Sequence, residues 1–148
     1  MKRPLILISN DDGPEAHGLH SLIKVAKNYG RVVVVVSGEG QSGKSHSITI
    51  KTPLRIREIQ RKDDVKFYVT NGTPVDSIKL ALDQILNEKP DYVFSGINHG
   101  SNAAVSVIYS GTMGVAIEAG LHRIPAAGFS LLNHSQNADF TLAEKVAD

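Results

Sequence analysis

Cysteine and tryptophan are absent from this sequence of 148 residues, and aromatic residues make up only 5% of it. The lack of cysteine excludes disulfides, thiolate metal sites and a cysteine nucleophile, and it is typical of a reducing compartment. No apolar run approaches the ~20 residues of a membrane span. The short apolar run at residues 5–8 is followed at once by Asn10, Asp11 and Asp12, unlike a signal peptide. We therefore expect a soluble, cytoplasmic protein with no membrane partner.

An excess of charge of one sign is also missing. Sixteen Lys and Arg residues face 15 Asp and Glu residues, which leaves a formal charge of +1. Such a balance disfavours a protein that binds a nucleic acid polymer through its overall field. The basic residues of segment 51–62 lie close to acidic ones, as on a solvated face. A chain of this length predicts a single domain, residues 1–148, with one hydrophobic core.

Strand-like and helix-like segments alternate along the first half of the chain. Residues 5–9 and 31–37, the latter with five consecutive valines, have the composition of strands covered on both faces. Between them, apolar residues recur at helical spacing up to Gly30, which predicts a helix. Residues 47–70 alternate apolar and polar side chains and predict a hairpin-like insertion.

The second half continues the alternation. Thr73 and Pro74 predict the start of a helix. Residues 92–95 and residues 125–130 are each predicted to form a strand. A helix is expected from about Ser110, with an inner face formed by Met113, Ala116, Ile117, Gly120 and Leu121. A last helix begins near Phe140 without a stop signal, so we expect the C-terminal part of the fold to be missing. The pattern predicts an α/β fold, a Rossmann-like doubly wound sheet that is mostly parallel, with function in the loops after Ser9, Val36 and Ser95.

Residues 38–45 match the phosphate-loop pattern of nucleotide triphosphatases, a glycine and four residues followed by Gly43, Lys44 and Ser45. A phosphate loop needs a helix behind it to receive the phosphates. The residues that follow, HSITIKTPLRI, alternate like a strand, and Pro53 would break a helix. A phosphate-loop NTPase is therefore only an alternative hypothesis.

Asp11 and Asp12 stand side by side directly after the first predicted strand. Adjacent carboxylates repel one another unless a cation neutralises them, and oxygen ligands select hard divalent ions such as Mg²⁺ or Mn²⁺. The alternative is structural, with one aspartate in a turn and the other capping the next helix. A phosphate-accepting receiver domain also carries paired acids there, but its other residues have no equivalents here.

Two further blocks carry polar groups suited to anions and cations. SGINHGSN contains Asn98 and Asn102, whose amide oxygens complete hard-cation sites and whose amide N–H groups bind phosphate oxygens. The stretch Ser110, Gly111 and Thr112 begins a predicted helix and forms either an anion site or an ordinary cap. The six histidines show no zinc spacing, and no GxSxG nucleophile elbow occurs.

Together, LISNDDG, QSGKSHSIT, NGTPVDS, SGINHGSN and YSGTMGVAIEA resemble the SurE family of stationary-phase survival proteins in order and spacing. The resemblance implies a SurE-like fold, truncated relative to typical members, and a divalent-metal-dependent phosphatase. The enzyme would act on nucleoside monophosphates as a 5′-nucleotidase. The resemblance also allows 3′-nucleotidase and short-chain polyphosphatase activities. It implies one Mg²⁺ or Mn²⁺ per subunit and a homodimer or homotetramer. A binding module without turnover is the alternative.

The resemblance also assigns residues. It places the metal ligands on Asp11, Asp12, Ser42 and Asn98, the catalytic groups on Asp11, Asp12 and Asn98, and the phosphate contacts on Asn98, Asn102, Ser110, Gly111 and Thr112. Asp11 would orient or deprotonate the attacking water, and His46 and His99 are candidates for the acid that protonates the leaving group. Where the family has a proline–aspartate pair and a basic residue, this chain reads SGEG.

Overall fold

The computed structural model describes residues 2–40, 43–59, 65–135 and 137–148 of the chain. Its strands are β1 (Leu5–Ser9), β2 (Arg31–Ser37), β3 (Ile56–Ile59), β4 (Lys66–Thr70), β5 (Tyr92–His99) and β6 (Ala126–Leu131). Its helices are α1 (His17–Tyr29), α2 (Pro74–Leu80), α3 (Gly111–Leu121) and α4 (Thr141–Ala147). Short helical turns are the π-helical η1 (Ala81–Ile85) and the 3₁₀-helical η2 (Ala104–Tyr109).

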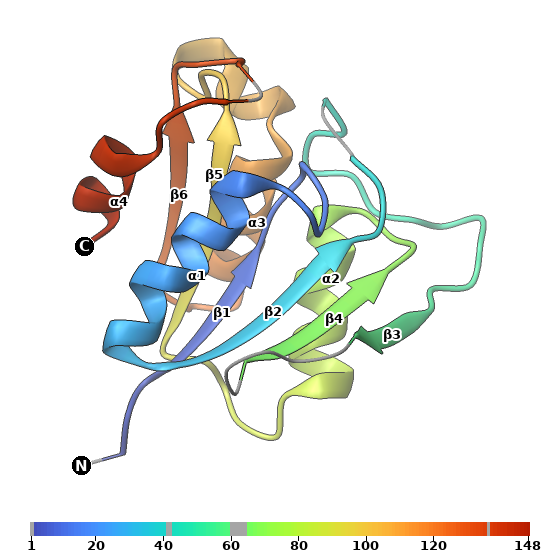
Figure 1. The fold of residues 1–148 in the computed structure, drawn as a ribbon. Helices are drawn as coiled ribbons and strands as arrows, with labels where there is room; N and C mark the ends of the chain where they lie inside the picture. Colours follow the sequence, from blue (N-terminus) through green and yellow to red (C-terminus); the bar gives the residue numbers. More distant parts are fainter. Residues whose placement is uncertain (1, 41–42, 60–64, 136) are drawn as a thin grey trace.

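The six strands form one sheet in the order β3-β4-β2-β1-β5-β6, parallel except for β3. Helix α1 covers one face of the sheet with α4 beside it, and α2 and α3 cover the other face (Figure 1). Two apolar clusters follow this division, one built around Ile8 and Leu19 and the other around Leu7 and Val115. The predicted doubly wound α/β fold is confirmed.

The sheet changes winding direction at β1. From β1 the chain moves outward through β2 and β4 and later returns to place β5 on the other side of β1. In open α/β sheets, ligands bind beyond the carboxyl ends of the strands where the strand order reverses. This topology puts Asp11 and Asp12, which follow β1, at the position where a site is expected.

The hairpin-like insertion differs in one respect from the prediction. Strands β3 and β4 pair antiparallel, as a hairpin would, but β4 also pairs in parallel with β2 and extends the main sheet. Residues 46–55, which the alternation predicted as a strand, are irregular. Side chains hold their backbone in place of a neighbouring strand: Thr49 N–H donates to Asp76 Oδ2 at 3.0 Å, and Arg55 N–H donates to Asn71 Oδ1 at 2.8 Å.

Strand β5 is longer than predicted. It continues past Ser95 to His99, through the first half of the segment expected to be a loop. The register with β6 shifts between Ser95 and Asn98, and the Gly96–Ile97 peptide bond is cis. Pairing with β6 resumes beyond the shift, at Asn98 and His99, so Asn98 is carried by the sheet.

Helix α2 begins as its sequence predicts. The Thr73 hydroxyl accepts a hydrogen bond from Asp76 N–H at 3.1 Å, and the Asp76 carboxylate accepts one from Thr73 N–H at 2.9 Å. This is a capping box, with Pro74 in the first helical position. The carboxylate of Asp76 also lies at the positive end of the helix dipole.

The inner face predicted for α3 is wrong. Ile117 and Leu121 are exposed, at 42% and 69%. The buried residues of the helix are Gly111, Thr112, Gly114, Val115, Glu118 and Ala119. Because α3 is apolar on nearly all sides, its periodicity does not predict which face is buried. The charged Glu118 argued against the face that is in fact buried.

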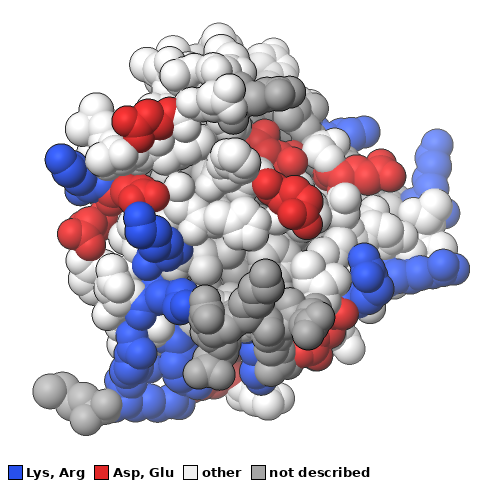
Figure 2. Space-filling view, in the orientation of Figure 1, with Lys and Arg blue, Asp and Glu red and all other residues white. Residues whose placement is uncertain are grey.

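Charged side chains of both signs occur over the face shown in Figure 2, in keeping with the balanced composition. None of the helices in the described part of the chain is long and apolar enough to span a membrane.

Candidate active site

Asp11 is held by the first turn of α3. It follows β1, only 4% of its surface is exposed, and its Oδ1 accepts a hydrogen bond from Thr112 Oγ1 at 2.7 Å. The two residues are 101 positions apart in the chain. The tertiary structure therefore joins the predicted acidic loop to the predicted anion-binding helix start.

Gly111 permits this close contact. A Cβ atom at this position would lie 2.7 Å from Asp11 Cβ and 2.9 Å from its Oδ2, closer than real Cβ atoms approach. Only glycine therefore lets the start of α3 approach the carboxylate. As the first residues of the helix, Gly111 and Thr112 have backbone N–H groups without intrahelical partners. These donors and the dipole of α3 favour a bound anion beside Asp11.

Asp12 is half-buried and has a raised pKa. Burial is the largest cause, and the neighbouring charge of Asp11 adds to it. The His99 N–H group, which donates to Asp12 Oδ2 at 3.4 Å, and the His99 side chain oppose the increase. Neither aspartate caps α1, whose N-cap is Ala16 with no side-chain hydrogen bond. The capping alternative for the pair is therefore excluded, and a cation would relieve the repulsion between the carboxylates.

Asn98 presents an amide oxygen at the end of β5. The side chain is 8% exposed, and its Nδ2 donates to the carbonyl oxygens of His99 and Gly100, both at 3.1 Å. With both amide hydrogens used by carbonyls, Oδ1 is left without a hydrogen-bond partner among the described residues. A neutral oxygen ligand beside two carboxylates suits a hard divalent ion.

Asn102 and Ser110 are engaged in other contacts. Asn102 Nδ2 donates to Ser130 Oγ at 2.6 Å, and Ser130 is the β6 residue paired with Asn98. Ser110 Oγ accepts from Met113 N–H at 3.0 Å and is the N-cap of α3. Ser110 therefore serves as an ordinary cap, and its hydroxyl hydrogen can still be donated to a ligand.

The histidines considered as leaving-group acids both have partners. His46 Nε2 lies 3.1 Å from Glu118 Oε2, on the α2 and α3 side of the sheet. His99 Nδ1 lies 3.0 Å from the carbonyl oxygen of Asn133, and its ring stacks edge-on against Phe140. His99 is the closer of the two to the aspartates, because its own backbone contacts Asp12.

Ser42 lies outside the described residues, so its predicted role as a metal ligand stays a prediction. The preceding residue that is described, Gly40, lies beside the acidic loop, since a Cβ built on it would be 3.9 Å from the Asp12 carbonyl oxygen. The described residues between Ser45 and the start of α2 at Pro74 contain no helix. The local structure that a phosphate loop requires is therefore missing there.

Two buried polar side chains near the acidic loop, Ser9 and Asn10, were not predicted from the sequence to be functional, whereas a third, Ser95, begins the polar block SGINHGSN. Ser9 Oγ, Asn10 Oδ1 and Ser95 Oγ are buried and have no hydrogen-bond partner among the residues that the structure describes, and Ser9 and Ser95 are paired in register on β1 and β5. Burying an unpaired polar atom is costly, and such atoms gather at functional sites. Only the pairing of β1 with β5 brings them together.

A cavity of 680 Å³ opens at the carboxyl ends of β2 and β4, one to two strands from β1. Its lining includes Glu39, Arg55, Arg57 and Asn71. Its volume is within the range of small-molecule sites. In the described part of the chain, no three His, Cys, Asp or Glu side chains come together to hold a metal ion. A cation at the aspartate pair would therefore need hydroxyl, amide or water oxygens as further ligands.

Comparison with known proteins places this arrangement in a family. The family model described as "Survival protein SurE" matches residues 6–148. The chain belongs to the SurE family. The family resemblance inferred from the five sequence blocks is thereby confirmed.

Among SurE relatives, the "5'-nucleotidase SurE" of Flavobacterium psychrophilum is 52% identical over 141 residues, which are 95% of this chain and 55% of that protein. The "5'-nucleotidase SurE" of Chlorobaculum tepidum is 49% identical over 146 residues, 99% of this chain and 55% of the relative. The crystal structure of the SurE protein from Aquifex aeolicus superimposes with a TM-score of 0.84 at 39% identity, covering 97% of this chain and 56% of that one. The chain thus spans about half the length of the SurE proteins that it matches.

Proposed function

We propose that the chain is a divalent-metal-dependent phosphatase that hydrolyses nucleoside monophosphates to nucleoside and phosphate. The observation that carries the proposal is the contact of Asp11 with the start of α3. This contact sets a carboxylate beside the first backbone N–H groups of a helix, which have no intrahelical partners. Relatives that match nearly the whole chain are named 5'-nucleotidase SurE, which supports the same reaction. Hydrolysis of 3′-nucleotides and of short polyphosphates belongs to the same proposal.

The residues present suit one Mg²⁺ or Mn²⁺ ion. Asp11, Asp12 and Asn98 would hold it, together with Ser42. A hard cation would lower the raised pKa of Asp12 and would supply a partner for Asn98 Oδ1, which has none among the described residues. When bound, such an ion supplies Lewis acidity at the phosphoryl group and favours ionisation of water.

The protein's own groups would orient the reactants. Asp11, fixed by Thr112, would accept a proton from the water that attacks phosphorus, and the bond from phosphorus to the ester oxygen would break. The N–H groups at the start of α3, together with Asn98, Asn102 and the Ser110 hydroxyl, would bind the phosphoryl oxygens as negative charge develops. The leaving nucleoside oxygen would take up a proton.

The cavity beside the site offers room for the nucleoside. With strands about 4.8 Å apart, the ends of β2 and β4 lie roughly 5–10 Å from β1. A nucleoside attached to a phosphate at Asp11 would extend into the cavity lined by Glu39, Arg55 and Arg57. A carboxylate can accept hydrogen bonds from ribose hydroxyls, and guanidinium groups stack on bases.

Phosphate release from AMP and from ATP, each with and without EDTA, tests the proposal. EDTA-sensitive release from AMP is the expected result. Release from ATP alone would instead support the phosphate-loop NTPase, and metal-dependent binding of AMP without release would support a binding module.

A variant focuses the test on Asp11. Asp11→Asn keeps the shape of the side chain and an oxygen for Thr112 but removes the base, so hydrolysis with Mn²⁺ supplied should fall by about 100-fold or more. Near-normal hydrolysis by a folded Asp11→Asn protein would remove this residue from the mechanism.

Assembly and location complete the proposal. We place the protein in the cytoplasm as a homodimer or homotetramer. The exposed apolar side chains of α3 and η2, which include Ile108, Tyr109, Ile117 and Leu121, support self-association. Light scattering on the purified chain should give twice or four times the monomer mass of 15.9 kDa.

A further inference from the structure

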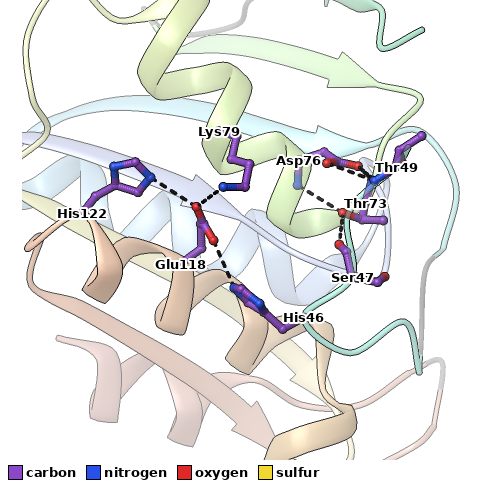
Figure 3. A network of polar contacts seen from close by, with 8 residues as sticks. All are labelled: His46, Ser47, Thr49, Thr73, Asp76, Lys79, Glu118 and His122. Atoms are coloured by element: carbon purple, nitrogen blue, oxygen red, sulfur yellow. Dashed lines mark hydrogen bonds and ion pairs between the residues drawn. The ribbon is translucent and has the colours of Figure 1, made fainter. Parts of the chain in front are cut away.

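Glu118 is a buried acid that the proposed reaction does not use. It lies on the buried face of α3 with 2% of its side chain exposed, and three basic side chains surround it (Figure 3). Lys79 from α2 contacts Oε1 at 2.7 Å, and His122 at the end of α3 contacts the same oxygen at 3.2 Å. His46, from the irregular segment 43–49, contacts the other oxygen, Oε2, at 3.1 Å.

These partners keep the carboxylate ionised. Burial alone would raise the pKa of Glu118, but the hydrogen bond and charge of Lys79, with smaller contributions from His122 and His46, lower it overall. An ionised carboxylate can only accept hydrogen bonds, so His46 Nε2 must donate to it. Oε1 therefore bonds to Lys79 of α2 and to His122 at the end of α3, whereas Oε2 bonds to His46.

That segment, residues 43–49, has no regular secondary structure and depends on tertiary contacts for its conformation. Ser45 N–H donates to the Tyr109 carbonyl at 3.1 Å, and the Thr73 hydroxyl donates to the Ser47 carbonyl at 2.7 Å. Thr49 N–H donates to the Asp76 carboxylate. The bond from His46 to Glu118 is the contact of this set that ties the middle of the segment to α3 (Figure 3).

The segment also packs directly on α3. A Cβ at Gly114 would lie 3.0 Å from the Ser45 carbonyl oxygen and 3.4 Å from His46 Cα. Gly114 is one turn beyond Gly111 and Thr112, which contact Asp11. The first turn of α3 therefore orients Asp11. Further along the same helix, Gly114 and Glu118 contact segment 43–49.

We propose that Glu118 is a positioning residue that, through His46, fixes segment 43–49 against α3, the helix whose first turn contacts Asp11. A buried ion pair contributes little net stability compared with apolar residues of similar volume, so packing of α2 on α3 does not require this charge. What an apolar side chain could not provide is an acceptor for His46. The proposal rests on the proposed function for its consequence, because segment 43–49 directly follows Ser42, a residue predicted to bind the metal.

Hydrogen exchange of segment 43–49, measured by mass spectrometry on the metal-free chain, tests the positioning role directly. His46→Leu and Glu118→Leu should each speed exchange of these amides. His46→Gln, which keeps an N–H donor at similar reach, should restore the wild-type rate. His122→Ala is the matched control, because it removes a partner of the other carboxylate oxygen and should leave segment 43–49 unchanged.

Two further readouts separate positioning from general stability. Lys79, His46 and His122 are partly exposed and can be solvated when their acceptor is lost, so Glu118→Leu should change the melting temperature only slightly. It should nevertheless weaken Mn²⁺ binding by about tenfold, as loss of an outer support of a metal site does. His46→Leu should weaken Mn²⁺ binding to the same extent, and His46→Gln should not. The proposal is overturned if His46→Leu leaves exchange of the segment unchanged, or if His122→Ala speeds it equally.

These measurements stay distinct from the nucleotidase test. Exchange is followed without metal or nucleotide, so it decides whether Glu118 holds the segment even if AMP is not hydrolysed. If exchange responds as expected and Mn²⁺ binding does not, Glu118 shapes the loop without serving the metal site, and the positioning proposal fails in its functional part.

Discussion

Thr112 donates a 2.7 Å hydrogen bond to the carboxylate of Asp11, across 101 residues of sequence. The contact exists because Gly111 lets the first turn of α3 approach the end of β1. It fixes the carboxylate beside the backbone N–H groups of the helix start, where a phosphoryl group would be bound. Two motifs that are far apart in the sequence are thus in direct contact, as the proposed site requires.

Gly111→Ala should damage this site. The added Cβ would lie 2.7 Å from Asp11 Cβ, so α3 or Asp11 must move, with an expected loss of about 1–3 kcal/mol in the free energy of unfolding and a fall in phosphatase activity. Gly120→Ala is the control on the same helix. Nothing lies within 4 Å of its Cβ position, so it should stabilise the protein by about 0.5–1 kcal/mol without loss of activity. Urea unfolding and AMP hydrolysis measure both effects, and equal behaviour of the two variants would contradict the close contact.

Mn²⁺ should stabilise the folded chain by binding to the aspartate pair. At 100 times the dissociation constant, the gain is about 2.7 kcal/mol, visible as a rise in melting temperature that EDTA reverses. Asp12→Asn and Ser42→Ala should reduce the rise, whereas Lys44→Ala should not. If Lys44→Ala weakened Mn²⁺ binding more than Ser42→Ala did, the phosphate-loop hypothesis would regain support.

Glu118 should make stability depend on pH in the acid range. Its pKa in the folded protein is lowered from the ordinary value of 4.5, with the Lys79 and histidine contacts outweighing burial. The ionised form therefore contributes stability that is present above pH 4.5 and is lost as the pH falls through the folded pKa. Wild type should exceed Glu118→Gln in free energy of unfolding near pH 5, and the difference should shrink as the pH falls. A difference that stays constant down to about pH 3 would show that ionisation of Glu118 contributes nothing.

Arg57→Ala should weaken nucleotide binding without slowing the chemical step. Arg57 lines the cavity in which we place the nucleoside, away from the reacting atoms. Loss of one exposed charged contact is worth about 1 kcal/mol, so KM for AMP should rise about fivefold with kcat unchanged. Lys51→Ala, an exposed basic residue that does not line the cavity, is the control. An unchanged KM in Arg57→Ala would place the nucleoside elsewhere.

Local sequence determined the elements whose signals are short-range. The valines of β2 predicted a strand buried on both faces, and Thr73, Pro74 and Asp76 predicted the start of α2, because caps and β-branched runs act through neighbouring residues. The acidic pair and the helix start at Ser110 were recognised for the same reason. The alternation of strands and helices was enough to predict the doubly wound sheet.

Long-range contacts decided the rest. Residues 46–55 have the alternation of a strand, but side chains from elsewhere hold their backbone, Asp76 at Thr49 and Asn71 at Arg55. Strand β5 extends to His99 because β6 pairs with it beyond the irregularity. Neither outcome is visible in the local pattern, since both depend on which partner the backbone finds.

Helix α3 shows most clearly which features the local sequence predicts and which depend on tertiary contacts. By itself, the sequence determined that a helix begins at Ser110 and that it is apolar on nearly every side. Only the tertiary structure decided which side is buried, because Glu118 enters the interior with Lys79 and His46 as partners from distant parts of the chain. A charge can be buried only where such partners meet it, and periodicity along one helix contains no information about residues that come from elsewhere.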